Sequence, residues 1–409
     1  MSLVALASTV MTNSATFFLG CTDETNNRVI VVQNSNNIVR QYDMTTFAQV
    51  SSSTSAAGLS GVALISSASA VFCGSSASVV QFYELATGYV QSVSASNGTN
   101  GKNQLIAGDT STNVVMYLTS AANTIYRVNS NFTVTTLTIN FNSGNDSSFQ
   151  SIINIGSGRW LVGNQGGAII EIDNNGNITN RLSVSVDTTQ GVANYETNSG
   201  VVFFPISNMA YDNNMLLVGG GDGTILVYDY STGTRIAQYQ MRSASQNAGI
   251  MFSPSASGEV VGISNVTASN PGLTAFEMDF TVKPLKFYSD GYIYTNSTGA
   301  PQDVGINTQT GVGWWLQTNS ANSLATIYFY KLNSPRATTT RVFTLPVVGQ
   351  KGRLALLDGT SGSTVGRPIL DTYMVSPATY RVPTGKTIVE WVKVGEGEDA
   401  TWGASSYST

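Results

Sequence analysis

Acidic side chains are the groups in this sequence best suited to chemistry, because histidine is absent. Of 409 residues, 24 are Asp or Glu and none is His. This excludes Ser-His-Asp and Cys-His nucleophile systems and His-ligated metal sites. Two carboxylates a few ångströms apart would suffice for glycoside hydrolysis, and Asp187, Glu196 and Asp303 are candidates at strand ends or in insertions. Nothing in the sequence groups them, so we expect no enzymatic activity; a carboxylate-based polysaccharide-degrading enzyme is the least favoured alternative.

Two polar motifs resemble ligand loops but favour turns. The run Asp173-Asn174-Asn175-Gly176-Asn177 has closely spaced oxygen ligands, yet it lacks the repeated Asp and distal Glu of a calcium loop. The run from Gly219 to Gly223 is Gly-rich, but no Lys or helix follows to hold a phosphate. We therefore predict a turn and a hairpin, and no metal site or cofactor.

Four tryptophans are candidates for binding. Trp314 and Trp315 are adjacent in a strand-like run, so the two rings face opposite sides; at least one should be core, and either could present a platform to a sugar. Trp391 and Trp402 lie near the carboxyl terminus, where a small module would leave aromatic rings incompletely buried. These two are candidates for a partner interface.

The two cysteines and the charge balance narrow the range of partners. Cys21 and Cys73 occupy apolar strand-like runs, as expected of buried thiols, and whether they pair stays open. The net charge is -5 and only 11% of residues are charged, with no basic cluster, which argues against nucleic acid and anionic lipid. No apolar run approaches the ~18 residues that span a membrane. No Lys or Arg precedes the apolar run from Leu3 to Val10, so we expect no signal peptide and no membrane insertion.

Strand-like meanders recur along the chain and define its organisation. The stretch from Met215 to Met241 predicts three strands joined by Gly219–Gly223 and by Ser231–Thr234. The run from Gly200 to Phe204 precedes it and is expected to be the first strand of this fifth unit. Comparable units recur, and the third strand of each ends in an acidic or amide residue. Successive end residues are about 41 to 56 positions apart. These end positions are Asp43, Glu84, Asn129, Asp173, Asp229, Asp279 and Asn333. We interpret the side chain at each as satisfying backbone amides of the next turn.

This repeat predicts an all-β fold, a β-propeller of about seven four-stranded blades followed by a small β module. Residues 16–345 resemble the seven-bladed β-propeller repeat proteins, although the Gly-His and Trp-Asp marks of WD40 repeats are missing. The fourth strand of the seventh blade is expected at Thr339–Phe343. Residues 1–15 would be a closing strand or an amino-terminal arm, since a ring needs to be closed. Residues 346–409 fit no blade and predict a small β docking module with a flexible tail.

In overall style the chain looks like virion appendage proteins of tailed bacteriophages. That resemblance rests on an all-β body rich in Ser, Thr, Asn and Gly, with few charges. It implies a non-enzymatic structural or attachment protein (a head or tail decoration, fibre or receptor-binding component), made in the host cytoplasm and placed in the virion. Its partners would be other virion subunits or itself in a homo-oligomer, and a host surface glycan or protein. The alternative is a cellular propeller acting as a lectin or protein-interaction scaffold.

Overall fold

A computed structural model describes the strands of the chain and many of the turns between them. The described residues are 2–11, 18–33, 38–54, 59–74, 79–94, 105–118, 124–139, 149–164, 167–184, 196–198, 201–203, 206–212, 214–220, 224–240, 250–254, 259–264, 272–279, 286–294, 300–307, 309–319, 324–333, 343–344, 351–358, 367–373, 379–380, 386–394 and 404–405. Every strand pair among them is antiparallel. Among these residues, no helix has the length and apolar character that crossing a bilayer requires.

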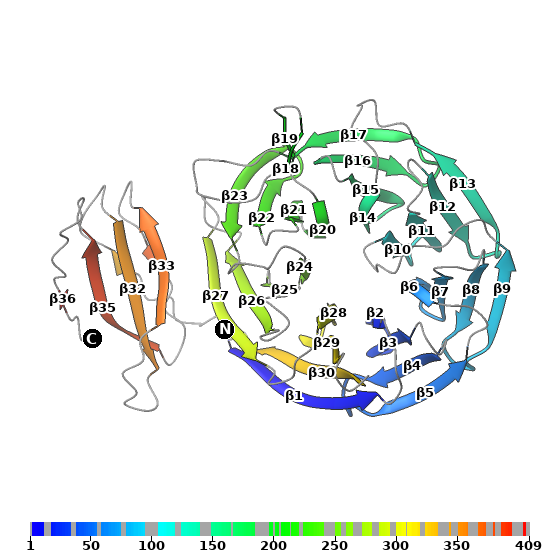
Figure 1. The fold of residues 1–409 in the computed structure, drawn as a ribbon, viewed down its shortest axis with the longest axis horizontal. Helices are drawn as coiled ribbons and strands as arrows, with labels where there is room; N and C mark the ends of the chain where they lie inside the picture. The colour runs from blue at the N-terminus through cyan, green and yellow to red at the C-terminus, as the bar shows by residue number, and fades with distance from the viewer. Residues whose placement is uncertain are drawn as a thin grey trace.

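Four-stranded meanders arranged around a closed ring form the body of the molecule (Figure 1). The first contains β2 (Phe18–Asp23), β3 (Arg28–Gln33), β4 (Ile38–Asp43) and β5 (Gln49–Thr54). The second contains β6 (Leu59–Ser66), β7 (Ser69–Gly74), β8 (Val79–Glu84) and β9 (Val90–Ser94). The third contains β10 (Ile106–Asp109), β11 (Val114–Leu118), β12 (Thr124–Asn129) and β13 (Val134–Thr138). The fourth contains β14 (Phe149–Asn154), β15 (Arg159–Asn164), β16 (Ala168–Asp173) and β17 (Ile178–Ser183). The next contains β20 (Ile206–Asp212), β21 (Met215–Gly220), β22 (Thr224–Asp229) and β23 (Thr234–Gln240). It is followed by β24 (Ile250–Pro254), β25 (Glu259–Ser264), β26 (Gly272–Asp279) and β27 (Lys286–Tyr294). The last blade contains β28 (Ala300–Ile306), β29 (Val312–Asn319) and β30 (Leu324–Asn333), together with the amino-terminal strand described below. The first strand of each meander lies innermost, so the all-β propeller fold predicted from the sequence is confirmed.

The amino-terminal strand β1 (Ser2–Met11) closes the ring. It pairs antiparallel with β30, from Ser2 opposite Asn333 to Met11 opposite Ala325, and is the outer strand of the last blade. The sequence had suggested the run around Thr339–Phe343 for this place. Residues 334–342 lie outside the described part of the chain, and Phe343 begins the short strand β31 (Phe343–Thr344), which pairs with β34 (Thr379–Tyr380). The outer strand expected at Thr339–Phe343 is therefore wrong, and the position is taken by β1, within the residues 1–15 that were expected as a closing strand or an arm.

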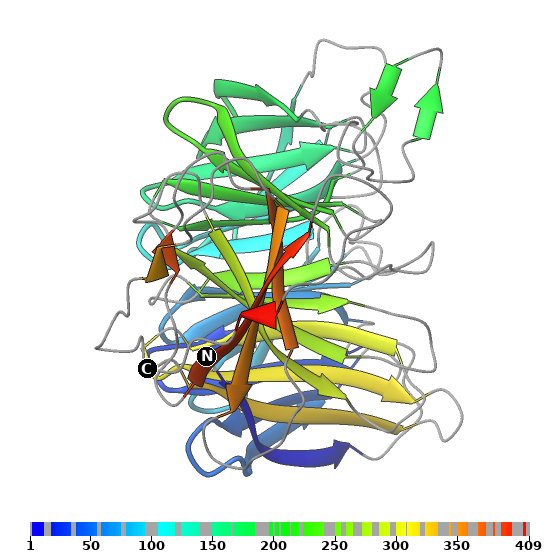
Figure 2. The same ribbon diagram turned by 90° about the vertical axis from the view of Figure 1, so that its left-hand side faces the viewer.

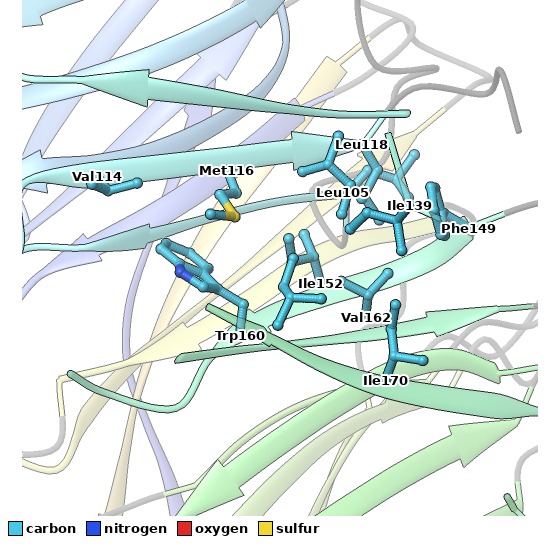
Figure 3. Packing of buried hydrophobic residues seen from close by; sticks show 12 residues of the cluster. Leu105, Val114, Met116, Leu118, Ile139, Phe149, Ile152, Trp160, Val162 and Ile170 are labelled. Atoms are coloured by element: carbon cyan, nitrogen blue, oxygen red, sulfur yellow. The ribbon is translucent and has the colours of Figure 1, made fainter. Parts of the chain in front are cut away.

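Alternation along the strands supplies the packing between blades. In β3, Val29 and Val31 pack toward the last blade, whereas Ile30 and Val32 pack toward the β6–β9 blade. The first blade is thus buried on both faces, as radial packing requires. Figure 3 shows one such interface, where Met116 of β11 and Trp160 of β15 lie in the same buried cluster.

One inner strand differs from the sequence prediction. The run from Gly200 to Phe204 was expected to open the fifth blade, but Val201–Phe203 forms β19, which pairs with β18 (Glu196–Asn198) in a separate hairpin. The innermost strand is β20, beginning at Ile206. The apolar run is followed by Pro205, and proline has no amide to give to a central sheet ladder. Figure 2 shows the hairpin projecting beyond one end of the ring.

Asp43, Asp173 and Asp229, at the ends of third strands, cap the next turns through backbone amides, as the sequence suggested. The Glu84 carboxylate instead accepts from the Thr87 hydroxyl. The Asp43 carboxylate accepts hydrogen bonds from the backbone amides of Thr45 and Thr46, at 2.8 and 2.7 Å. Asp173 and Asp229 make equivalent bonds in their own turns. These amide donors lower the carboxyl pKa of Asp43, as hydrogen bonds to a charged form do. The run Asp173–Asn177 is therefore a turn, and Gly176 supplies its positive φ of 83°.

The same turns place a residue with positive φ against the preceding blade. Gly88, Gly176 and Gly233 occupy this position in three blades, whereas Phe47 (φ 60°) and Phe132 (φ 65°) occupy it in two others. Left-handed backbone costs a bulky residue roughly 1–2 kcal/mol. Ring packing on the preceding blade offsets that cost: Phe47 meets Phe329 at 5.1 Å and Phe132 meets Phe82 at 4.5 Å between ring centroids.

Replacing these two phenylalanines by glycine should therefore have unequal effects on stability. Phe132→Gly removes the conformational cost of positive φ and loses a ring that is 41% exposed. Its free energy of unfolding should therefore stay within about 1 kcal/mol of wild type. Phe47→Gly loses a ring packed on a buried cluster and should lower that free energy by about 2 kcal/mol. Urea unfolding of both variants measures this difference. Equal losses of unfolding free energy would contradict the proposal that ring packing offsets the cost of positive φ.

A charged network ties the β14–β17 blade to its neighbour. Arg159 donates to both carboxylate oxygens of Glu171, at 2.8 and 3.0 Å. Thr179 donates to the same carboxylate at 3.0 Å, and so does the hydroxyl of Tyr230 from the next blade. The Arg159 bonds, aided by these hydroxyls, lower the pKa of Glu171 against the opposing effect of burial. Burial and the Glu171 charge raise the pKa of Tyr230.

Acid should weaken the bonds that the Glu171 carboxylate makes with Arg159 and Tyr230. Because the folded pKa of Glu171 is depressed, its stabilisation is complete above the unfolded value of about 4.3 and is lost as pH falls through the folded pKa. Glu171→Gln should lower the free energy of unfolding at pH 7 by about 1–3 kcal/mol, leaving Arg159 without its anion. The variant and the wild type should converge as pH falls through the lowered pKa of Glu171 in the folded protein. Unfolding curves between pH 3 and 7 measure this, and a difference that does not change with pH would refute it.

A separate small sheet contains the carboxyl-terminal strands. Its order is β33 (Arg367–Tyr373), β32 (Lys351–Asp358), β35 (Lys386–Val394) and β36 (Ala404–Ser405). In Figure 1 this sheet lies outside the ring, beside β27. The role of residues 346–409 in docking stays a prediction.

Candidate binding site at the central cavity

A cavity of about 520 Å³ opens among the inner strands of four neighbouring blades. The strands β28, β2, β6 and β10 contribute its walls, and they lie next to one another along one side of the middle of the ring in Figure 1. The turn that follows each strand contributes its rim. We call Glu24, Thr25, Ser67, Thr110 and Gln309 the mouth residues.

Three glycines let the inner strands come this close together. A Cβ on Gly108 would collide with the backbone carbonyl oxygen of Leu64 in the preceding blade. A Cβ on Gly20 or Gly305 would meet the indole of Trp314 at 2.6 or 2.5 Å. The Trp314 ring is therefore inserted between the last blade and the first, where its Nε1 donates to the Thr22 hydroxyl at 2.8 Å. The cavity wall is closely packed at these three glycines, where a larger residue would not fit.

The lining is polar at the mouth and apolar within. Thr25, Ser67, Thr110 and Gln309 are exposed, whereas Val62 is buried in the wall. Glu24 is the one carboxylate among the lining residues, and no Lys or Arg belongs to that set. The arrangement suits hydrogen bonding and apolar contact with a polypeptide, and it lacks the cations that phosphate groups attract.

The three candidate acids do not converge on a reactive site within the described residues. Asp303 is 5% exposed, and its carboxylate accepts hydrogen bonds at 2.9 Å from the backbone amides of Gly20 and Val304. It thus links the last blade to the first. Glu196 lies in the β18 hairpin, opposite Phe203, and Asp187 lies outside the described part of the chain. No cluster of three potential metal ligands occurs in the part of the chain that the structure describes.

The structure buries both adjacent tryptophans. Trp314 and Trp315 are each 1% exposed, so neither ring is available as a sugar platform. The sequence predicted at least one of them in the core, and the structure buries both because both faces of this blade are covered. Trp391 lies in β35, opposite Leu354 and Ser405, and Trp402 lies outside the described residues. Their role as a partner interface stays a prediction.

Cys21 is a free thiol at the edge of the cavity. Burial, with the charges of Asp23 and Asp303, raises its pKa above the ordinary value, so the unreactive thiol form is favoured. Cys73 lies in β7, opposite Gly61 of β6, and its side chain falls outside the described set.

Sequence reasoning missed the cavity altogether. Except for Glu24 its residues are neutral, and none belongs to a catalytic or metal-ligand motif. Trp314 was a candidate only as a sugar platform. The available signal was the glycine within the first strand of three blades, at Gly20, Gly108 and Gly305. Glycine inside a strand often marks a close approach of another backbone or side chain.

Comparison with known proteins places the fold but not the family. No protein-family model and no curated protein matches the chain. The structure is similar to that of U3-55K, with a TM-score of 0.57 and 8% identity over 80% of this chain and 98% of that chain. It is also similar to the β-propeller domain of Cps50 (Swd1) from Myceliophteria thermophila, with a TM-score of 0.55 and 10% identity over 78% and 99% of the two chains.

A third similar structure is the WD40 β-propeller domain of Doa1, with a TM-score of 0.54 and 13% identity over 82% of this chain and 98% of that chain. Identities this low establish a shared fold alone. The comparisons leave the number of blades unconfirmed and give no indication of a bacteriophage virion protein. The chain is a β-propeller whose architecture is similar to that of WD40 repeat proteins.

Proposed function

We propose that this protein is a non-enzymatic interaction scaffold that binds a partner polypeptide at the mouth of the central cavity. The observation that carries the proposal is the rigid cavity itself, whose walls are fixed by Gly20, Gly108, Gly305 and the inserted Trp314. Exposed neutral side chains surround its entrance. Propellers presenting turns on a rigid body are well suited to binding proteins, and the similar WD40 structures support this class of function.

Paired purifications test the proposal. The tagged full chain is expressed in its native source and recovered with its partner, alongside Thr110→Arg, which projects a long side chain over the mouth. The matched control is Ser130→Arg, at an exposed turn between β12 and β13. We expect a partner at fixed stoichiometry with wild type and with Ser130→Arg, and at least a tenfold loss with Thr110→Arg. Equal recovery from both variants would contradict binding at the mouth.

The class of partner is a finer proposal. Composition alone supports a role as a virion attachment or structural component, with other virion subunits, a sister copy, or a host glycan or protein as partner. Density-gradient separation of the native source followed by mass spectrometry tests this. Recovery at fixed stoichiometry with a capsid or tail protein would support the virion role. Recovery only in soluble fractions would leave the cellular scaffold as the function.

A further inference from the structure

The wall of the central cavity contains carboxylates from three of its four blades. Glu24 is the one charged residue among the described residues that line the cavity. Asp23, Asp109 and Asp303 each lie next to a lining residue in the chain, and they are 1%, 4% and 5% exposed. The first, third and last blades therefore each bring a carboxylate to the cavity wall.

Neutral donors hold two of the buried aspartates. Asp23 accepts hydrogen bonds from the backbone and side-chain amides of Asn26, at 3.1 and 2.7 Å. Asp109 accepts from the backbone amides of Ser111 and Gly158, at 2.9 and 2.8 Å. Burial acts to raise the pKa of Asp109, but its hydrogen bonds, led by that of the Ser111 hydroxyl, lower the pKa below its ordinary value. Amides and hydroxyls stabilise a carboxylate without cancelling its charge, so negative charge remains at the wall.

The negative field reaches the cavity itself. Cys21 lines the cavity, and burial, followed by the charges of Asp23 and Asp303, raises the pKa of its thiol. Arg28 lies opposite Asp23 in the sheet, but its Nη1 donates to Gln41 of β4 at 3.1 Å. Salt screens buried charges much less than exposed ones, and a cleft lined by one sign of charge attracts ions of the opposite sign. A cation is therefore the charged group that this cavity attracts.

The rest of the lining suits the aliphatic part of a basic side chain. Val62, Leu64, Ile106 and Val304 contribute apolar surface to the walls. Lys and Arg carry their charge at the end of an aliphatic stem, which packs on such surface. The mouth residues offer hydroxyl and amide oxygens as acceptors for cationic N–H groups. The cavity volume of about 520 Å³ lies in the range of roughly 300–1,000 Å³ that is typical of ligand pockets.

We propose that the partner polypeptide inserts a basic side chain, a lysine or an arginine, into the central cavity and that Glu24 pairs with its cation. The buried aspartates contribute through their field, since their oxygens already accept hydrogen bonds within the wall. This inference rests on the function proposed above, because both place the partner at the cavity mouth. It adds that the bound segment is basic and that an acidic side chain at the same position is repelled.

Thermal unfolding of the full chain with small amides tests the charge preference. The probes are the Nα-acetyl methylamides of lysine, arginine and norleucine, and norleucine matches the lysine stem without its ammonium group. Each is titrated at constant ionic strength while the unfolding midpoint is followed. We expect a saturable rise in the midpoint with a basic amide and none with the norleucine amide. A rise with the lysine amide alone identifies an ammonium group, a rise with the arginine amide alone identifies a guanidinium group, and a rise with both identifies charge as the requirement.

Glu24→Gln and Glu84→Gln form a matched pair of variants. Both remove one carboxylate, but Glu84 is exposed at the end of β8 and does not line the cavity. Glu24→Gln should raise the half-saturating concentration of the basic amide about fivefold, whereas Glu84→Gln should leave it unchanged. Three results would overturn the inference: no saturable rise with either basic amide, an equal rise with the norleucine amide, or equal half-saturation in Glu24→Gln and wild type.

Failure of this inference is distinguishable from failure of the proposed function. Loss of the copurified partner in Thr110→Arg, together with any of those three results, would refute the basic side chain and keep the mouth as the binding site. Full recovery of the partner with Thr110→Arg would instead refute binding at the mouth, and this inference with it.

Discussion

Deletion of residues 1–11 is expected to open the ring and to lower the unfolding midpoint more than any single core substitution. The deletion removes β1, which pairs with β30 from Ser2 to Met11. It leaves β30 as an unpaired edge and uncovers the cluster that Met11 helps to bury with Ile327 and Phe329. A propeller avoids exposed edges by closure, so we expect a loss of cooperative unfolding together with aggregation.

Differential scanning calorimetry and analytical ultracentrifugation of the deletion variant measure this outcome. The matched control is Val10→Thr in the full chain, because Val10 is 55% exposed and contributes little burial. Adding a synthetic peptide of the sequence SLVALASTVM should restore part of the midpoint by supplying β1 in trans. A deletion variant that stays monomeric with an unchanged midpoint would show that β1 does not close the ring.

Trp314→Ala is the single substitution with the largest expected effect, a loss of about 3–5 kcal/mol in the free energy of unfolding. The indole is 1% exposed and fills the space between the last blade and the first. Its loss also removes the hydrogen bond to Thr22. The inner strands are too constrained to collapse into the vacated volume, so the cost should lie at the upper end for such substitutions.

A double-mutant cycle makes this prediction specific to the geometry. Gly305→Ala alone should be destabilising, because its Cβ would meet the indole at 2.5 Å. In the Trp314→Ala background that conflict is gone, so adding Gly305→Ala should cost far less than it does in wild type. Urea unfolding of the four proteins gives the coupling energy. Additive effects would contradict the close packing of Trp314 on Gly305.

The repeating architecture could be predicted because two local signals agreed. Alternating apolar residues marked the strands, and an acidic or amide residue after each third strand marked the turn that follows; Asp43, Asp173 and Asp229 do cap those turns. Both signals depend on neighbouring residues in the sequence, which makes them readable without tertiary information.

The errors came from features decided by distant parts of the chain. The outer strand of the last blade is β1, which pairs with residues more than 300 positions away, and no local pattern distinguishes it from a strand near residue 340. The run from Val201 to Phe203 was apolar enough for an inner strand but forms a hairpin instead. The burial of both Trp314 and Trp315 likewise depends on two neighbouring blades. Alternation in the sequence predicts that the two rings lie on opposite faces of the blade, but it does not show whether both faces are covered.

The central cavity was beyond prediction for the same reason. Its walls come from β2, β6, β10 and β28, four strands dispersed over most of the chain. Neutral side chains such as Thr110 and Gln309 gain importance only when the ring brings them together. A binding surface of this kind carries no motif, whereas a catalytic or metal site would have required particular residue types.

Hydrogen–deuterium exchange of the full chain, alone and with its copurified partner, tests the central claim that the partner binds at the mouth of the cavity. We predict slower exchange on binding in the turns that carry Glu24, Thr110 and Gln309, with the outer turn at Ser130 unchanged. Protection that is confined to the outer strands or to residues 346–409, with the mouth unaffected, would contradict the proposed site.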